Sequence, residues 1–152
     1  MFKPLTLQSN ARRSFQITVG LEEGYGTGIK HTTKEVQDLI GEWLAVRMAV
    51  NEKSLAGGVF SGTLIYAWNT PATGIKVTSE DIAVFSGEVS PVYCAHYTDD
   101  EVKEVLYNLA SFIGIRLKQT RMYVAYKDEI QVYEDDQAAH PTRPVPPIST
   151  VE

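Results

Sequence analysis

The sequence predicts an α+β protein with one antiparallel sheet and two helices, and three patterns lead to this prediction. Phe15, Ile17 and Val19 alternate with polar residues, which indicates a half-buried strand. Apolar residues spaced by three and four indicate amphipathic helices over about 33–51 and 99–118. A threonine followed three positions later by a glutamate precedes both segments, as at the start of many helices.

Four strands are expected: along the chain, one precedes the first helix, two lie between the helices and one follows the second helix. The first covers residues 14–19. Residues 55–68 are rich in Val, Ile, Phe, Tyr and Trp, which indicates a long strand. After a Pro/Gly-containing turn at 69–74 and a short extended piece at 75–79, residues 81–89 form a second strand in hairpin relation to it. Residues 121–133 alternate again and form the last strand, within which Lys127-Asp128-Glu129 is the candidate for a local turn.

Both helix starts carry a capping box, formed by Thr32 with Glu35 and by Thr98 with Glu101. Gly41 weakens the first helix and is expected to mark close packing. The stripe predicted to be buried in the first helix comprises Val36, Leu39, Ile40, Trp43, Leu44, Met48 and Val50. The stripe of the second comprises Val102, Val105, Leu106, Leu109, Phe112, Ile113 and Leu117.

The resulting order, β-α-β-β-α-β, is that of a ferredoxin-like sandwich. Its four-stranded antiparallel sheet would have both helices on one face, because β-α-β crossovers are right-handed. The first and third strands would be adjacent and central. We expect their C-terminal ends to lie at the same edge of the sheet, which would bring the two strand-to-helix joints side by side.

The sheet face without helices is expected to be unusually aromatic. A bare aromatic face is commonly covered by another chain, so we predict a homo-oligomer that packs through the open sheet face. The residues on which this prediction depends are Phe60, Leu64, Tyr66, Trp68, Phe85, Tyr123 and Tyr133.

The 152 residues suit one domain. Residues 1–12 are expected to be a lead-in, with a short edge strand around Leu5 and Leu7, and residues 13–134 the single domain. Residues 135–152 are rich in proline and lack periodicity, which predicts a flexible extended tail. A tail that wraps a neighbouring subunit is the alternative.

Composition narrows the class of protein. Apolar residues at 43% and charged residues at 22% are typical of a soluble globular chain. The net charge of −5 argues against a nucleic-acid partner, and the apolar runs are too short for a membrane partner or a signal peptide. Cys94 is the lone cysteine, which excludes an intramolecular disulfide and favours the reducing cytoplasm.

The glycine-rich stretch between the first strand and the first helix is the strongest functional signal. Its glycines let the backbone approach a ligand, and the neighbouring helix starts offer free amides to a small anionic ligand such as a nucleotide or phosphorylated metabolite. Its spacing fits neither the dinucleotide fingerprint nor a P-loop. The candidate ligand-binding residues of the two joints are Gly24, Tyr25, Gly26, Gly28, Lys30, His31, His96 and Tyr97.

Other chemistries have less support in the residue pattern. His31, His96 and Cys94 are ligand types for zinc or copper, but their spacing does not predict a metal site. Cys94 with His96 is a conceivable nucleophile and base, yet both would lie on one strand face, better placed to pack than to exchange a proton. We therefore predict no metal, no cofactor and no catalytic set.

The leading hypothesis is a non-enzymatic, oligomeric protein that senses or sequesters a small anionic ligand near paired helix N-termini. Nitrogen-regulatory PII-like proteins of similar topology act in this way, although no PII motif is present. The alternative is a cofactor-independent ferredoxin-like enzyme, an isomerase, monooxygenase or decarboxylase, with His96 or His31 as acid/base. A structural or protein-interaction module is the second alternative.

Overall fold

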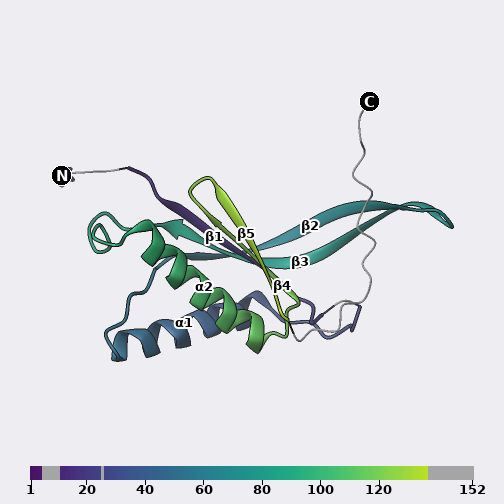
Figure 1. Ribbon diagram of the computed structural model, residues 1–152, viewed down its shortest axis with the longest axis horizontal. Helices are drawn as coiled ribbons and strands as arrows, with labels where there is room; N and C mark the ends of the chain where they lie inside the picture. Colours follow the sequence, from purple (N-terminus) through teal and green to yellow (C-terminus); the bar gives the residue numbers. More distant parts are fainter. Residues whose placement is uncertain (5–10, 25, 137–152) are drawn as a thin grey trace.

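The computed structural model describes residues 1–4, 11–24 and 26–136. These residues form one antiparallel sheet with strand order β2-β3-β1-β4-β5, and two helices that lie on the same side of it (Figure 1). The elements are β1 (Ser14–Gly20), α1 (Thr33–Ala49), β2 (Gly58–Thr70), β3 (Gly74–Glu88), α2 (Asp99–Arg116), β4 (Arg121–Tyr126) and β5 (Glu129–Glu134).

The α+β class is confirmed, but the sheet has five strands instead of the predicted four. The segment predicted as the last strand folds back on itself at Lys127-Asp128, where Lys127 adopts a positive φ of 54°. Residues after this turn form β5, which pairs antiparallel with β4. The elements from β1 to β5 fall within the predicted domain, residues 13–134.

The core lies between the helices and one face of the sheet. Phe15, Ile17 and Val19 of β1 are almost fully buried, as the alternation predicted. The stripe of α2 is buried as predicted except at Phe112, which is partly buried. In α1 the buried stripe is shorter, because the predicted members Met48 and Val50 at its end are exposed.

The first helix cap forms as predicted. The Thr32 hydroxyl accepts from the Glu35 amide at 3.1 Å, and the Glu35 carboxylate accepts from the Thr32 amide at 2.6 Å. At α2 only half of the predicted box is present. The Thr98 hydroxyl accepts from the Glu101 amide at 3.2 Å, whereas the Glu101 carboxylate pairs with Lys53 at 3.0 Å.

The predicted meeting of the two strand-to-helix joints is wrong. β1 and β3 are adjacent but antiparallel, so Ser14 pairs with Glu88 and Gly20 pairs with Ile82. The C-terminal ends of two antiparallel neighbours point in opposite directions. The glycine-rich loop after β1 and the joint after β3 therefore lie at opposite ends of the sheet.

The open sheet face is less aromatic than predicted. Two of the seven residues assigned to it, Phe85 and Tyr133, lie on the helix side, because Phe85 belongs to the buried core and Tyr133 pairs with buried Met122. The open face does carry exposed apolar side chains, including Phe60, at 59% exposure, and Tyr123, at 41%.

The β2–β3 hairpin is longer than the sheet it belongs to. β1 pairs with β3 from Ile82 to Glu88, and the Leu21 amide donates to the Asp81 carbonyl at 3.0 Å. Among the described residues, the hairpin beyond this point, up to its turn at residues 71–73, is a two-stranded ladder with no third strand. In Figure 1 this ribbon projects well beyond the helices. We refer to it below as the ribbon; the sequence pattern did not predict its projection.

Some expectations concern residues outside the described part of the chain. These are the edge strand around Leu5 and Leu7, Tyr25, and the tail from residue 137 onward. Among the described residues, neither helix combines the length and the apolar character that crossing a bilayer requires.

Gly41 does not mark close packing, and this gives a stability prediction. No atom outside the helix lies within 4 Å of a Cβ added at Gly41, whereas a Cβ at Gly57 would stand 2.6 Å from the Ser86 carbonyl oxygen. Gly41→Ala should raise the free energy of unfolding by about 1 kcal/mol, through helix propensity. Gly57→Ala should lower it by about 1–3 kcal/mol, through overpacking. Urea denaturation measures both; a Gly41→Ala variant less stable than the parent would contradict this packing.

Candidate functional site

The glycine-rich loop after β1 closes on itself. Gly24, Gly26 and Gly28 adopt positive φ angles of 53°, 68° and 75°, which glycine tolerates best. The amide of Gly28 donates to the Glu22 carboxylate at 3.0 Å, and the Thr27 hydroxyl donates to the Glu23 carbonyl at 2.6 Å. An anionic ligand would need the backbone amides and hydroxyls of the loop as hydrogen-bond donors. Two of these donors already bind acceptors within the loop itself.

His31 joins this loop to the start of α1. Its Nε2 lies 3.0 Å from a Glu23 carboxylate oxygen, and its Nδ1 lies 3.4 Å from Glu35. The side chain is only 15% exposed. The backbone hydrogen bond from Thr32 is the main cause of a lowered pKa for Glu35. The free amide of Thr32 and the positive N-terminal end of α1 thus already face carboxylates of the same chain. This arrangement weakens the case for an anion-binding site here.

The joint after β3 is built around Arg13. Its guanidinium donates to the Tyr97 carbonyl at 2.6 Å and to the Cys94 carbonyl at 3.2 Å. The Tyr97 hydroxyl accepts from the Ser54 amide at 3.4 Å. His96 is exposed, with its ring edge-on to Tyr97 at 4.9 Å between centroids. These contacts fix the chain between β3 and α2.

A second polar group anchors the start of α2 at this end. The Tyr126 hydroxyl donates to Asp99 at 2.5 Å, and Lys127 donates to the other Asp99 oxygen at 3.1 Å. Hydrogen bonds from Tyr126 and Lys127 lower the pKa of Asp99. Burial and the Asp99 carboxylate raise the pKa of Tyr126 to about 12. This group is a structural anchor between β4 and α2.

The predicted ligand-binding residues therefore fall into two separate groups. Gly24, Gly26, Gly28, Lys30 and His31 lie at the C-terminal end of β1. His96 and Tyr97 lie at the opposite end of the sheet, and Tyr25 is outside the described residues. No group of three or more His, Cys, Asp or Glu in the described part of the chain is arranged to hold a metal ion.

The sequence pattern missed a pair of acceptor oxygens at Gly20, the last residue of β1. A Cβ placed on Gly20 would lie 2.5 Å from the carboxylate Oε1 of Glu80 and 2.9 Å from the amide Oε1 of Gln119. These side chains come from β3 and from the segment between α2 and β4. Both oxygens lie so close to Gly20 that any larger residue at this position would clash with them. We call this group the Gly20 site.

Gln119 is held so that its acceptor faces the Gly20 site. Lys118, with a φ of 50°, turns the chain after α2. The Gln119 side-chain amide then donates to the Glu22 carbonyl at 2.9 Å and to the Leu117 carbonyl at 3.3 Å. Both donors of this 9%-exposed residue are occupied, so its oxygen is the group left to accept from a ligand.

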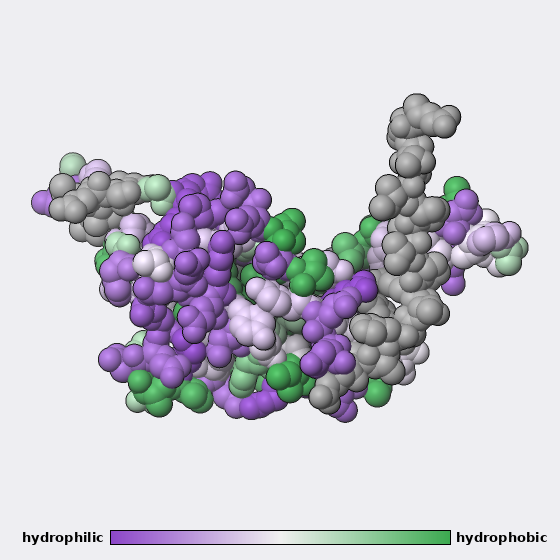
Figure 2. Space-filling view, in the orientation of Figure 1, coloured by the Kyte–Doolittle hydropathy of each residue, from purple (hydrophilic) through white to green (hydrophobic). Residues whose placement is uncertain are grey.

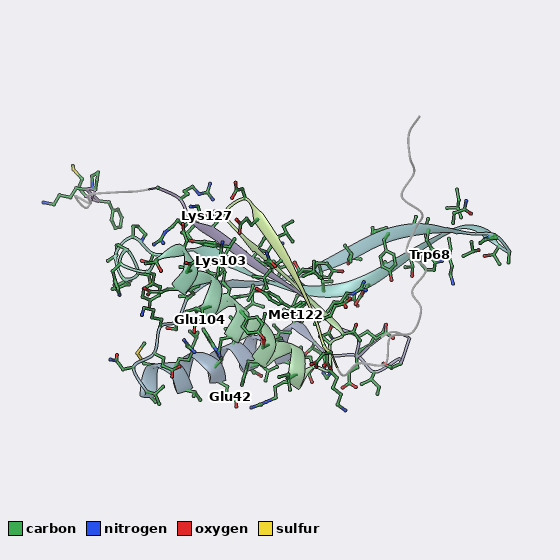
Figure 3. All side chains as sticks on the ribbon, viewed as in Figure 1. Glu42, Trp68, Lys103, Glu104, Met122 and Lys127 are labelled. Atoms are coloured by element: carbon green, nitrogen blue, oxygen red, sulfur yellow. The ribbon has the colours of Figure 1, made fainter. Side chains whose placement is uncertain are left out.

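An aromatic surface adjoins the Gly20 site. Gln119 also lines a groove of about 600 Å³ between α2 and the β4–β5 hairpin. Met122 and Tyr133 in its lining place that groove on the helix side of the sheet, whereas Glu80 is on the open face. On the ribbon, Tyr66 is diagonal to Glu80 across the strand pair. The rings of Tyr66 and Trp68 stack at 5.6 Å, and Figure 3 shows Trp68 standing clear of the helices.

The chemistry of the Gly20 site follows from its atoms. Two acceptors, one of them a carboxylate, suit a hydrogen-bond donor or a cation. The neighbouring aromatic pair suits a flat ring or a cation over its face. A signal for Glu80 was present in the sequence, because it stands two positions before Ile82 on the same strand face. The predicted strand began one residue too late to include it.

Sequence comparisons leave the family open, whereas structural comparison finds related folds. No protein-family model and no curated protein sequence matches the chain. A phage SAM lyase solved in complex with S-methyl-5′-thioadenosine is similar in fold, with a TM-score of 0.59 and 13% identity. The match covers 88% of this chain and 99% of the lyase. A phage SAM lyase solved in the apo state is also similar, with a TM-score of 0.57 and 12% identity. That match covers 89% of this chain and 99% of the lyase chain.

The Tyr126–Asp99 contact predicts an alkaline dependence of stability. The folded-state pKa of Tyr126 is raised from 10.0 to about 12, so its contribution is complete below pH 10 and is lost as pH rises toward 12. Over this range, loss of the Tyr126 contribution lowers the free energy of unfolding by at most about 1.4 kcal/mol per pH unit. Tyr126→Phe should flatten this decline in urea denaturation at several pH values, whereas Tyr107→Phe, at a half-exposed position, should not. Equal slopes in the parent and Tyr126→Phe would contradict the assignment.

Proposed function

We propose that this protein binds a small molecule at the Gly20 site, and that the ligand carries a cationic or hydrogen-bond-donating group beside a flat ring. An S-adenosyl sulfonium or its thioether nucleoside product has both features. The sulfonium is a cation, and adenine offers an amino group and an aromatic face. The expected ligand class is therefore adenosyl sulfonium compounds and their thioether products.

The single observation that carries the proposal is the convergence of the Glu80 and Gln119 oxygens at Gly20. An acceptor pair attracts cations and donors and repels anions. At the glycine-rich loop, Glu22, Glu23 and Glu35 already surround the amides and His31. The small-molecule role predicted from the sequence is kept in this proposal, while the residues and the charge of the ligand differ.

The likeness to the phage SAM lyase supports the choice of ligand class. That protein was solved with S-methyl-5′-thioadenosine bound, and its whole length matches this fold. At 13% identity the likeness concerns the fold, so the ligand is carried over here only because the Gly20 site independently suits it. The order β2-β3-β1-β4 also supports a ferredoxin-like arrangement, with β5 as an added edge strand.

An enzyme is the second candidate function. A lyase would cleave a carbon–sulfur bond of the sulfonium: the sulfur keeps the bonding electron pair and leaves as a neutral thioether. The alkyl fragment loses a proton to form a double bond or closes a ring through its own carboxylate. In this chain Glu80 is the charged group best placed to orient the cationic substrate, since it faces the Gly20 site. The histidines proposed from the sequence as acid/base have less support: His31 lies between two glutamates, and His96 is exposed at the other end of the sheet.

Calorimetric titration with S-adenosylmethionine, S-methyl-5′-thioadenosine and inorganic phosphate tests this proposal. The parent protein should bind at least one of the two adenosyl compounds and should not bind phosphate. Glu80→Gln removes a charge-assisted contact and should weaken binding of S-adenosylmethionine by about 10- to 100-fold. Glu104→Gln, on the exposed side of α2 (Figure 3), is the matched control and should bind like the parent.

Two further variants separate the Gly20 site from the glycine-rich loop. Gly20→Ala should displace the Glu80 and Gln119 oxygens and weaken binding, and it should also lower stability because two hydrogen bonds hold the buried Gln119 side chain in place. Lys30→Ala, in the loop, should leave binding unchanged. Binding of phosphate that depends on Lys30, or binding of adenosyl compounds unaffected by Glu80→Gln, would overturn the proposal. Chromatography of the incubated mixtures shows whether the thioether is released, which decides between binder and lyase.

A further inference from the structure

We propose that the ribbon, Thr63 to Asp81, is an assembly arm that docks on a second copy of this chain. The ribbon includes Glu80 and the Tyr66–Trp68 pair of the Gly20 site, but the proposal rests on the isolation, the apolar faces and the free edge of the ribbon and not on the ligand. The prediction from sequence placed self-association on the open sheet face. The structure adds a projecting element whose shape, composition and free edge call for a protein partner.

The first observation is the isolation of the ribbon. Among the described residues, its eight residue pairs, from Thr63–Asp81 to Thr70–Gly74, have no third strand beside them. A two-stranded ribbon alone in water is marginally stable at best. At about 3.4 Å per residue, eight pairs extend roughly 27 Å, which is about the length of the 18-residue helix α2. An element of this kind is stable when another surface covers it.

The second observation is that both faces of the ribbon are apolar. Leu64, Tyr66 and Trp68 lie on one face, in line with Phe60 on the open sheet. Ile65 and Val77 lie on the other face and are 69% and 66% exposed. In Figure 2 a few green residues stand on this projection among pale and purple ones. A solvated ribbon would alternate polar and apolar faces, so burial on both sides is the expected state.

The third observation is the free edge of β2. It is an edge strand along its whole length, and none of its thirteen residues is charged or proline. Edge strands that must stay unpaired usually carry lysine, proline or a bulge. The opposite edge strand, β5, has Glu129 and Glu134 at its ends. The β2 edge is therefore the one left open to a further strand.

The occupant is a second copy because the chain itself supplies a matching surface. The open sheet face presents exposed Phe60, Tyr123, Ile130 and Val132, which lack a covering layer among the described residues. Two ribbon faces of roughly 27 by 10 Å, together with this sheet face, approach the ~800 Å² that each partner buries in a stable interface. Symmetric self-association would cover the ribbon and the open face in one step.

Sedimentation equilibrium of the full chain tests the proposal, with native mass spectrometry as a second measure of mass. The parent should form an oligomer, and the double variant Ile65→Asp/Val77→Asp should run at the monomer mass of 16.9 kDa. The matched control, Val46→Glu/Ile115→Glu, changes two exposed apolar residues on the helices and should keep the parent mass. Circular dichroism and thermal melting establish that each variant is folded.

A shortened ribbon keeps the proposal testable if the charged double variant does not fold. Residues 66–78 are replaced by Asn-Gly, a two-residue turn that joins the paired residues Ile65 and Ser79. This variant keeps Glu80 and should be monomeric. A parent protein that is monomeric across the concentration range, including the case in which it binds only another protein, would overturn the proposal. So would a shortened variant that retains the parent mass.

Discussion

The antiparallel register between β1 and β3 is the constraint on which the rest of the structure depends. It pairs Ser14 with Glu88 and Gly20 with Ile82, so it decides what lies at each end of the sheet. Because side chains alternate between faces, the same register puts Phe15 and Phe85 into the core, where their rings lie 5.5 Å apart. It also places Gly20 beside the strand that carries Glu80. A register shift of one residue would turn the core residues of one strand to the open face and would move Gly20 away from Glu80.

This register also explains why the glycine-rich loop and the acceptor pair have different roles. The loop closes over its own glutamates and ties β1 to α1 through His31, which is a structural task. Gly20, the last residue of β1, has the Glu80 carboxylate and the Gln119 amide oxygen directed at it. Glu80 and the glutamates of the loop thus gather at this end of the sheet. In the proposed function these acceptors meet a cationic or hydrogen-bond-donating group.

Local signals in the sequence predicted local structure well. The alternation at Phe15, Ile17 and Val19 predicted β1, and Thr32 with Glu35 predicted the first helix cap, because both depend on residues close in sequence. Features set by distant residues were not predictable in the same way. Gln119 reaches the Gly20 site only because Lys118 turns the chain after α2, and the ribbon projects only because β1 stops pairing at Ile82.

We propose that the ligand meets the protein at Gly20 and not at the glycine-rich loop. An NMR titration of the ¹⁵N-labelled full chain with S-methyl-5′-thioadenosine distinguishes the two places. We expect the backbone amides of Gly20 and Leu21 and the side-chain amide of Gln119 to shift together as one binding curve. Shifts confined to Gly24–His31 or to His96 and Tyr97, with Gly20 and Gln119 unmoved, would contradict it.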